Sequence, residues 1–385
     1  MNKKDIANIR KQFKLDNHLM NIREILNVYV QKESGEIYHH VSQPFQLLDQ
    51  EAQELFLSNF KKVLTGNLDA KLFELKFKRD AEDSTQMFLF EGLQADTADD
   101  WKEYMLEIVG KMFAHTVYEF DTMVTFIRGE YKKSTRKRNT ESEEGGDDEV
   151  YSNEFVLCSL NRTDQPKKAL LFDYIEKEFK SYNVFDPIIN LESPLSGFLF
   201  PAFNDNAADV NHILYCAGKA NQPDGTFIEE VLNCEEIITA QEDKDCFDFV
   251  LKEVMGDEVD SQVISNVYEE IDKRIQESKE NDESETPTLD YRDIEKILTV
   301  SGVENVDTAK VEHAFKKVVD ETHEFKASSL VPKTIKINTK VADVTINPQD
   351  LKYVKYITYN GKRCLLLEVD EEVVVEGFRL ESKTL

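Results

Sequence analysis

Two strongly charged stretches interrupt this sequence, at residues 131–149 and 277–287. Neither can bury enough apolar surface to join a packed core, so we expect both to be exposed connections. A chain of 385 residues also exceeds the size at which a single core stops growing. We therefore predict an N-terminal α/β domain over 1–130, a charged linker over 131–150, a central β-rich domain over 151–236, a helical region over 237–330 with the acidic break at 277–287, and a C-terminal β segment over 331–385.

The spacing of apolar residues assigns elements to the first of these domains. Apolar positions three and four residues apart predict a helix over 3–26, with a break near Asp16. Two β-prone runs flank a turn that contains Gly35, and this pattern predicts a hairpin. The pattern further predicts helices over 49–64 and 98–114 and strands over 72–78, 86–90 and 122–130.

The rest of the chain is β-rich at first and then helical. Strand-like runs lie at 155–160, 169–172, 197–203 and 212–217, and helical patterns begin near 239, 261, 290 and 308. The dipeptide Asn360-Gly361 between two apolar runs is the strongest short signal for a hairpin. A third run at 373–380 would complete a small C-terminal β meander. The predicted fold class is therefore α+β, with several units in which helices pack on antiparallel sheets.

The charge of the chain is strongly acidic but unevenly spread. Lys and Arg number 47 and Asp and Glu 75, so the formal charge is 47 − 75 = −28. Residues 1–80 carry +2, and residues 81–385 therefore carry −30. Because affinity for nucleic acid comes largely from Lys and Arg, any contact with DNA is expected in the first third of the chain.

Two sets of basic residues are candidates for such a contact, although a solvated surface is the simpler interpretation of both. The first set lies on predicted regular structure, and the second lies in the linker, where the acidic run that follows neutralises it. The first set is Lys61, Lys62, Lys71, Lys76, Lys78 and Arg79, and the second is Lys132, Lys133, Arg136, Lys137 and Arg138.

Asp205, Asp209 and His212 are the candidate metal ligands. They follow the apolar run at 197–203 with spacings of four and three residues, and they offer oxygen and nitrogen atoms that suit a divalent cation. The segment 204–206 is more simply a turn, because Asn and Asp side chains bond their own backbone there.

Other chemical signatures are weak. Glu74-Leu75-Lys76 matches half of a restriction-type nuclease site, but the alternation of apolar residues places Glu74 and Lys76 on the solvated side of a strand. No phosphate-binding glycine loop, dinucleotide fingerprint or nucleophile elbow occurs, so we expect no cofactor. The five cysteines are odd in number and lack metal-ligand spacing, which indicates buried thiols. No apolar run approaches the roughly 18–20 residues that cross a bilayer, so a cytoplasmic location is expected.

The chain resembles a bacterial family, common in Gram-positive genomes, that is defined by a domain of unknown function. The segments that carry the resemblance are MNKKDIANIRKQFK (1–14), YVQKESGEIY (29–38), FKKVLTG (60–66), FVLCS (155–159), GFLFPAFND (197–205) and NGKR (360–363). The resemblance runs over the full length and implies no activity. The order of elements is also similar to that of the NdpA-type nucleoid-associated family, which implies a cytosolic, dimeric protein associated with the nucleoid.

These observations favour a non-enzymatic protein that is nucleoid-associated-like or binds a protein partner, in a DNA-related stress or phage-defence setting. The missing catalytic signature and the similarity of layout are the reasons. A metal-dependent hydrolase or nuclease is the first alternative, with Asp205, Asp209 and His212, or Glu74 and Lys76, in its site. The second is an acidic mimic of DNA, which the charge of −30 over residues 81–385 suggests.

Overall fold

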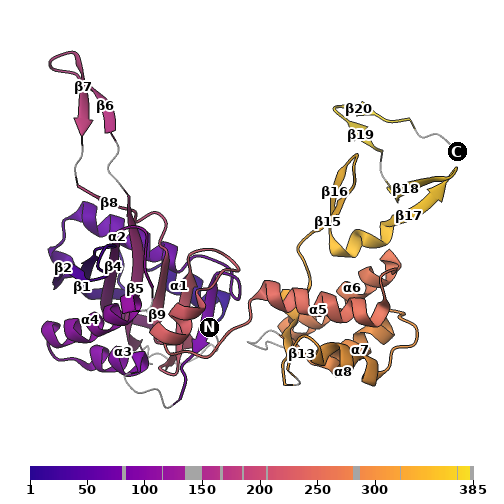
Figure 1. Cartoon of the computed structure of the whole chain (residues 1–385), viewed down its shortest axis with the longest axis horizontal. Coiled ribbons are helices and arrows are strands. Elements are labelled where there is room, and N and C mark those ends of the chain that lie inside the picture. The colour runs from indigo at the N-terminus through magenta and orange to yellow at the C-terminus, as the bar shows by residue number, and fades with distance from the viewer. Residues whose placement is uncertain are drawn as a thin grey trace, which may run out of the picture. The chain divides into compact units, whose positions relative to one another are not determined.

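A computed structural model gives the structure of the chain, and it divides into two compact units, Met1–Thr239 and Ala240–Leu385 (Figure 1). The two units are described separately. The residues that the structure describes are 1–79, 84–114, 116–134, 150–164, 168–183, 186–204, 207–280, 287–320, 322–370 and 372–381.

The first unit is built on an eight-stranded sheet in which each paired strand runs antiparallel to its neighbour. Along the sheet the order is β2 (Ile37–Pro44), β1 (Met20–Val30), β4 (Thr122–Ser134), β5 (Val150–Asp164), β9 (Ser196–Phe200), β12 (His212–Ala217) and β3 (Leu72–Lys76). The short β8 (Ile188–Ile189) pairs with the end of β5. The edges of the sheet are therefore β2 and β3.

Helices cover both faces of this sheet (Figure 1). One face packs on α1 (Lys3–Arg10) and α2 (Gln50–Val63), and the other packs on α3 (Thr85–Gln94), α4 (Ala98–Ala114) and the one-turn π-helix η2 (Phe227–Val231). On β5, Phe155 and Leu157 belong to the first core, and Val156 and Cys158 belong to the second. Successive side chains of a strand point to opposite faces, and helices bury both faces of this sheet. The central strands are therefore apolar almost throughout.

Arg128 on β4 joins the sheet to α3 and α4. Its side chain is 5% exposed, and its Nε donates to the carboxylate of Glu24 on β1. Its Nη1 donates to the carbonyl oxygens of Gly92 at 3.1 Å and Ala95 at 2.9 Å, at the end of α3. Its guanidinium also lies 5.4 Å from the ring centre of Trp101 on α4. One buried cation therefore binds a carboxylate of the sheet and two carbonyl oxygens at the end of α3.

Two short hairpins complete the first unit. One pairs β6 (Lys168–Asp173) with β7 (Glu178–Asn183), and the other pairs β10 (Ala202–Asn204) with β11 (Ala207–Asp209). The β6–β7 hairpin pairs with no strand of the eight-stranded sheet in the described part of the chain (Figure 1).

The second unit begins with helices packed around one apolar core. The helices are α5 (Ala240–Met255), α6 (Ser261–Glu280), α7 (Tyr291–Val300), α8 (Thr308–Lys316) and α9 (Ala327–Leu330), with β13 (Thr288–Leu289) paired to β14 (Phe325–Lys326). The turn η3 (Pro348–Tyr353) then packs on α6, where the Ser261 hydroxyl donates to the Val354 carbonyl at 2.7 Å.

Three hairpins form the C-terminal part of the second unit. They are β15–β16 (Ile335–Asn338 and Asp343–Ile346), β17–β18 (Val354–Tyr359 and Lys362–Leu367) and β19–β20 (Val374–Val375 and Phe378–Arg379). Asn360 and Gly361 both have positive φ, as the predicted two-residue turn requires. The run at 373–380 pairs with itself, so the expected meander consists of separate two-stranded hairpins.

The predicted fold class, α+β with antiparallel sheets and packed helices, is confirmed. Two predicted elements are wrong. The expected helix over 3–26 ends at Arg10 and is followed by β1, and the expected strand over 86–90 lies in α3. The predicted N-terminal and central domains, 1–130 and 151–236, contribute strands to the same sheet, because β4 and β5 pair with each other. Residues 131–134 of the expected linker lie in β4, and residues 277–280 of the expected acidic break lie in α6. Residues 135–149 and 281–286 lie outside the described residues. No helix within the described residues is both long and apolar enough to cross a membrane.

Candidate functional site

Acidic residues of the same unit compensate half of the first basic set. Lys62 on α2 pairs with Glu192, Lys76 on β3 lies 3.0 Å from Glu235, and Lys78 lies 3.5 Å from Glu229. Lys61, Lys71 and Arg79 form no ion pair with a described residue. Only three of the six cations of the first basic set are therefore left without an acidic partner among the described residues to contact a phosphate.

The second basic set falls mostly outside the described part of the chain. Lys132 and Lys133 lie in the last residues of β4, and Lys132 is exposed. Arg136, Lys137 and Arg138 lie outside the described residues.

The predicted metal ligands Asp209 and His212 bind each other. The Asp209 Oδ2 atom lies 2.6 Å from His212 Nδ1, and Asp209 Oδ1 accepts the Asn211 N–H at 3.0 Å. Burial raises the pKa of Asp209, but the hydrogen bonds from Asn211 and His212 more than offset this and lower it. Asp205 lies outside the described residues, and within these residues no three His, Cys, Asp or Glu side chains form a group that could hold a metal.

The Glu74 and Lys76 pair of the nuclease alternative is likewise engaged in structural contacts. The Asn204 side-chain amide donates to Glu74 Oε1 at 2.9 Å, and Lys76 pairs with Glu235. These contacts tie β3 to β10 and to the segment after η2.

Burial suppresses the chemistry of three cysteines. Cys158, Cys216 and Cys234 are buried in the first unit, and burial raises the pKa of Cys158 well above its usual range, that of Cys216 to about 11 and that of Cys234 to about 12. Cys246 and Cys364 are partly exposed. Because the thiolate is the reactive form, the three buried thiols are inert in the folded chain.

A thiol reagent is therefore expected to separate the cysteines into two groups. At pH 8, Ellman's reagent should modify Cys364 and, more slowly, Cys246 of the native chain, because burial and the nearby Asp243 carboxylate raise the pKa of Cys246. All five thiols should react only after denaturation. Changing both Cys246 and Cys364 to Ser should abolish the native reaction. A native reaction of three or more thiols would show that the first unit opens readily.

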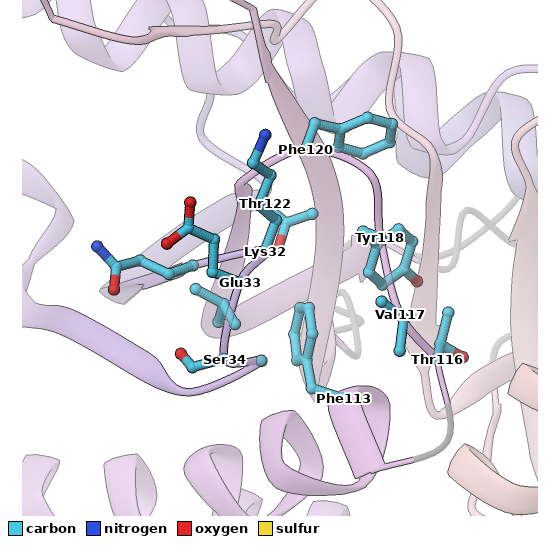
Figure 2. A pocket seen from close by; sticks show the side chains of 12 residues that line it. Lys32, Glu33, Ser34, Phe113, Thr116, Val117, Tyr118, Phe120 and Thr122 are labelled. Atoms are coloured by element: carbon cyan, nitrogen blue, oxygen red, sulfur yellow. The ribbon is translucent and has the colours of Figure 1, made fainter.

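A small cavity lies between the turn that joins β1 to β2 and the segment that joins α4 to β4 (Figure 2). Its volume is about 110 Å³, and the rings of Phe113, Tyr118 and Phe120 line one side, with successive ring centres 5.5 and 6.0 Å apart. The Thr122 hydroxyl at its base is buried and has no hydrogen-bond partner among the described residues. Pockets for drug-sized ligands measure roughly 300–1,000 Å³, so this cavity is too small for such a ligand and has room only for a few waters.

A basic surface that the sequence analysis missed lies in the C-terminal hairpins. Residues 331–363 contain seven Lys and Arg and two Asp, so their net charge is 7 − 2 = +5 in a chain of −28. The positive charge of residues 331–363 can be counted in the sequence, but the net charge of −30 over residues 81–385 conceals it. We refer to β15–β16 and β17–β18 as the basic hairpins.

Several cations of the basic hairpins are exposed and free. Lys336 on β15, Lys340 in the turn after it, and Lys362 and Arg363 on β18 form no ion pair with any residue that the structure describes. By contrast, Lys352 lies 3.0 Å from Glu269 on α6, which anchors the base of the hairpins.

Exposed tyrosines lie beside these cations. Tyr356 is 70% exposed and Tyr359 is 40% exposed. Tyr359 is directly opposite Lys362 in the β17–β18 pairing, and Tyr356 is diagonal to Arg363, since Tyr356 pairs with Leu365 and Thr358 pairs with Arg363. Each face of the β17–β18 hairpin therefore presents one tyrosine and one cation without an acidic partner among the described residues, and the Tyr359 face also carries Lys355, which pairs with Glu368.

The fold and these surfaces define a two-unit α+β protein with exposed C-terminal hairpins. The chain belongs to the family described as a domain of unknown function, DUF4317, whose family model matches residues 1–378. This match confirms the family expected from the sequence, and the similarity to the NdpA-type family stays a prediction. No curated protein matches the chain.

Proposed function

We propose that this chain is a nucleoid-associated-like binding protein that contacts single-stranded nucleic acid through its basic hairpins. The observation that carries the proposal is the +5 charge of residues 331–363, displayed beside exposed tyrosines in a chain of −28. This location replaces the first third of the chain, where Lys62, Lys76 and Lys78 already have acidic partners.

The pairing of cation and aromatic side chain is the reason for choosing a single strand. Unpaired bases stack on aromatic rings, each such contact contributing about 1–3 kcal/mol, while Lys and Arg neutralise the phosphates. Tyr356 with Arg363 and Tyr359 with Lys362 supply both contacts on each face of one hairpin. The acidic helices of the chain oppose binding over long distances only weakly at physiological salt, where the Debye length is about 8 Å.

Charge reversal at the basic hairpins is expected to weaken binding strongly. For a labelled thymidine oligonucleotide of about 20 bases, four neutralised phosphates predict that affinity falls about 50-fold between 50 and 200 mM salt. The variant with Lys336, Lys340, Lys362 and Arg363 changed to Glu should bind at least about 30-fold more weakly at 50 mM salt and lose most of this salt dependence. Fluorescence anisotropy gives both values.

A matched variant separates position from total charge. Changing Lys61, Lys62, Lys76 and Lys78 to Glu alters the net charge by the same amount but should leave the affinity within about threefold. Changing Tyr356 and Tyr359 to Ala should weaken binding about tenfold and keep the salt dependence, because stacking displaces no counterions. Absence of binding at 50 mM salt, equal loss in the two charge-reversal variants, or equal binding of polyglutamate would each overturn the proposal.

A further inference from the structure

The β6–β7 hairpin of the first unit has one apolar face that the other described residues leave exposed. In its register Phe172 is opposite Phe179 and Leu170 is opposite Ser181, so Leu170, Phe172 and Phe179 share one face. The other face carries the ion pair of Asp173 with Lys180, 2.8 Å apart, together with Glu178 and the half-exposed Leu171. We refer to Leu170, Phe172 and Phe179 as the apolar face of the arm.

The apolar face is well exposed in the structure. Leu170 is 70% exposed and Phe179 is 73% exposed, and the tip residues Tyr174 and Ile175 are exposed even more. The tip is nevertheless ordered, because Asp173 Oδ1 accepts the N–H groups of Ile175 at 2.9 Å and Glu176 at 3.1 Å. A two-stranded hairpin alone is marginally stable in water, so an exposed apolar face on such a hairpin indicates a binding surface.

Charge indicates what covers this face. Residues 168–183 contain three Lys and three acidic residues, so the arm has a net charge of 3 − 3 = 0, while the chain carries −28. Two copies of so acidic a chain repel each other over much of their surface, and the neutral arm adds nothing to this repulsion when it faces its own copy.

The area of the face is also sufficient. An aromatic side chain offers about 150–250 Å², so the exposed parts of the apolar face together with Tyr174 and Ile175 amount to on the order of 700 Å². Specific interfaces bury about 800 Å² on each partner. The apolar face and these two tip residues, packed against the same surface of a second copy, therefore approach the area of a stable homodimer interface.

We propose that the apolar face of the arm packs against the same face of a second copy of the chain, about a two-fold axis. A two-fold axis brings identical patches together, so Phe179 and Leu170 of each copy meet apolar side chains of the other. The resulting dimer buries the apolar face of both hairpins in a two-layer sandwich. This proposal is independent of the nucleic-acid proposal, because the basic hairpins belong to the other unit.

Sedimentation equilibrium of the full chain tests the dimer. We expect a dimer at micromolar concentration, and the double variant Leu170→Lys, Phe179→Lys should raise the dissociation constant at least about 100-fold. The control is Leu47→Lys, because Leu47 of the first unit is 72% exposed and lies outside the arm. The conservative variant Leu170→Met, Phe179→Leu should remain dimeric, which separates loss of the contact from misfolding.

Three results would overturn this proposal. The first is a monomeric native chain, in which case the arm has a different occupant. The second is a dimer that the double Lys variant leaves intact, and the third is equal loss of dimer in the Leu47→Lys control. Far-ultraviolet circular dichroism checks that each variant keeps its fold.

Discussion

Replacing Arg128 by Met is expected to lower the free energy of unfolding of the first unit by about 3–5 kcal/mol. The change removes three hydrogen-bond donors to Glu24, Gly92 and Ala95 and leaves the Glu24 carboxylate without its counterion. The loss of one member of such a buried pair costs more than the pair contributes, because the remaining charge is desolvated and unpaired. Trp101 is the single tryptophan and belongs to this unit, so its fluorescence during urea unfolding reports the change.

Two further variants define the origin of this effect. Arg162→Met is the control, because the Arg162 side chain is 46% exposed and its ion pair with Asp164 should contribute at most about 1 kcal/mol. Adding Glu24→Gln to Arg128→Met should recover part of the loss, because the unpaired charge is then absent. A loss below about 1 kcal/mol for Arg128→Met would contradict the buried position of this cation.

Replacing Gly197 by Ala is expected to destabilise the first unit by about 3 kcal/mol. Gly197 lies on β9, and an added Cβ would lie 2.5 Å from the Cys158 carbonyl oxygen on β5 and 2.8 Å from Val63 Cγ1 on α2. The carbonyl belongs to the backbone of a paired strand, so it cannot move without disturbing the sheet. The methyl group must therefore push β5, β9 and α2 apart.

A second glycine provides the matched control. Gly110 lies on α4, and an added Cβ there meets nothing within 4 Å. Gly110→Ala should therefore stabilise the unit by about 0.5–1 kcal/mol, since Gly in a helix loses more backbone entropy than Ala. Opposite signs for the two substitutions in urea unfolding are the expected result, and equal effects would show that β9 and α2 are loosely packed.

The spacing of apolar residues predicted the secondary structure correctly where an element buries only one face, because the spacing then shows the period of a helix or a strand. The helices over 50–63 and 98–114 are examples, and the dipeptide Asn360-Gly361 likewise predicted its turn. The strand run at 27–31 and its hairpin with 37–41 were predicted and are confirmed by the pairing of β1 with β2. Residues 20–26 of β1 were assigned to a helix, because the strand is buried on both faces and contains a bulge between Ile22 and Glu24. Its apolar residues then follow at intervals of three and one, which resemble a helix.

Tertiary pairing was beyond the reach of these patterns. The charged composition of 131–149 predicted an exposed connection, but residues 131–134 lie in β4 and residues 135–149 lie outside the described residues. Composition also does not show that β4 and β5 pair with each other. The acidic partners of Lys62, Lys76 and Lys78 likewise come from segments more than 120 residues away. The free cations of the C-terminal hairpins needed a local sum of charge, which summing residues 81–385 concealed.

The position of β3 at the edge of the sheet also has a consequence for synthesis of the chain. In the described residues β3 (Leu72–Lys76) pairs only with β12 (His212–Ala217) among the strands of the sheet. At about 5–20 residues per second, the ribosome needs on the order of 10–30 s to reach β12 after completing β3. During that time Phe73 and Leu75 lack their native strand partner. The nascent first unit is therefore open to aggregation or to holding by chaperones until its last strand emerges.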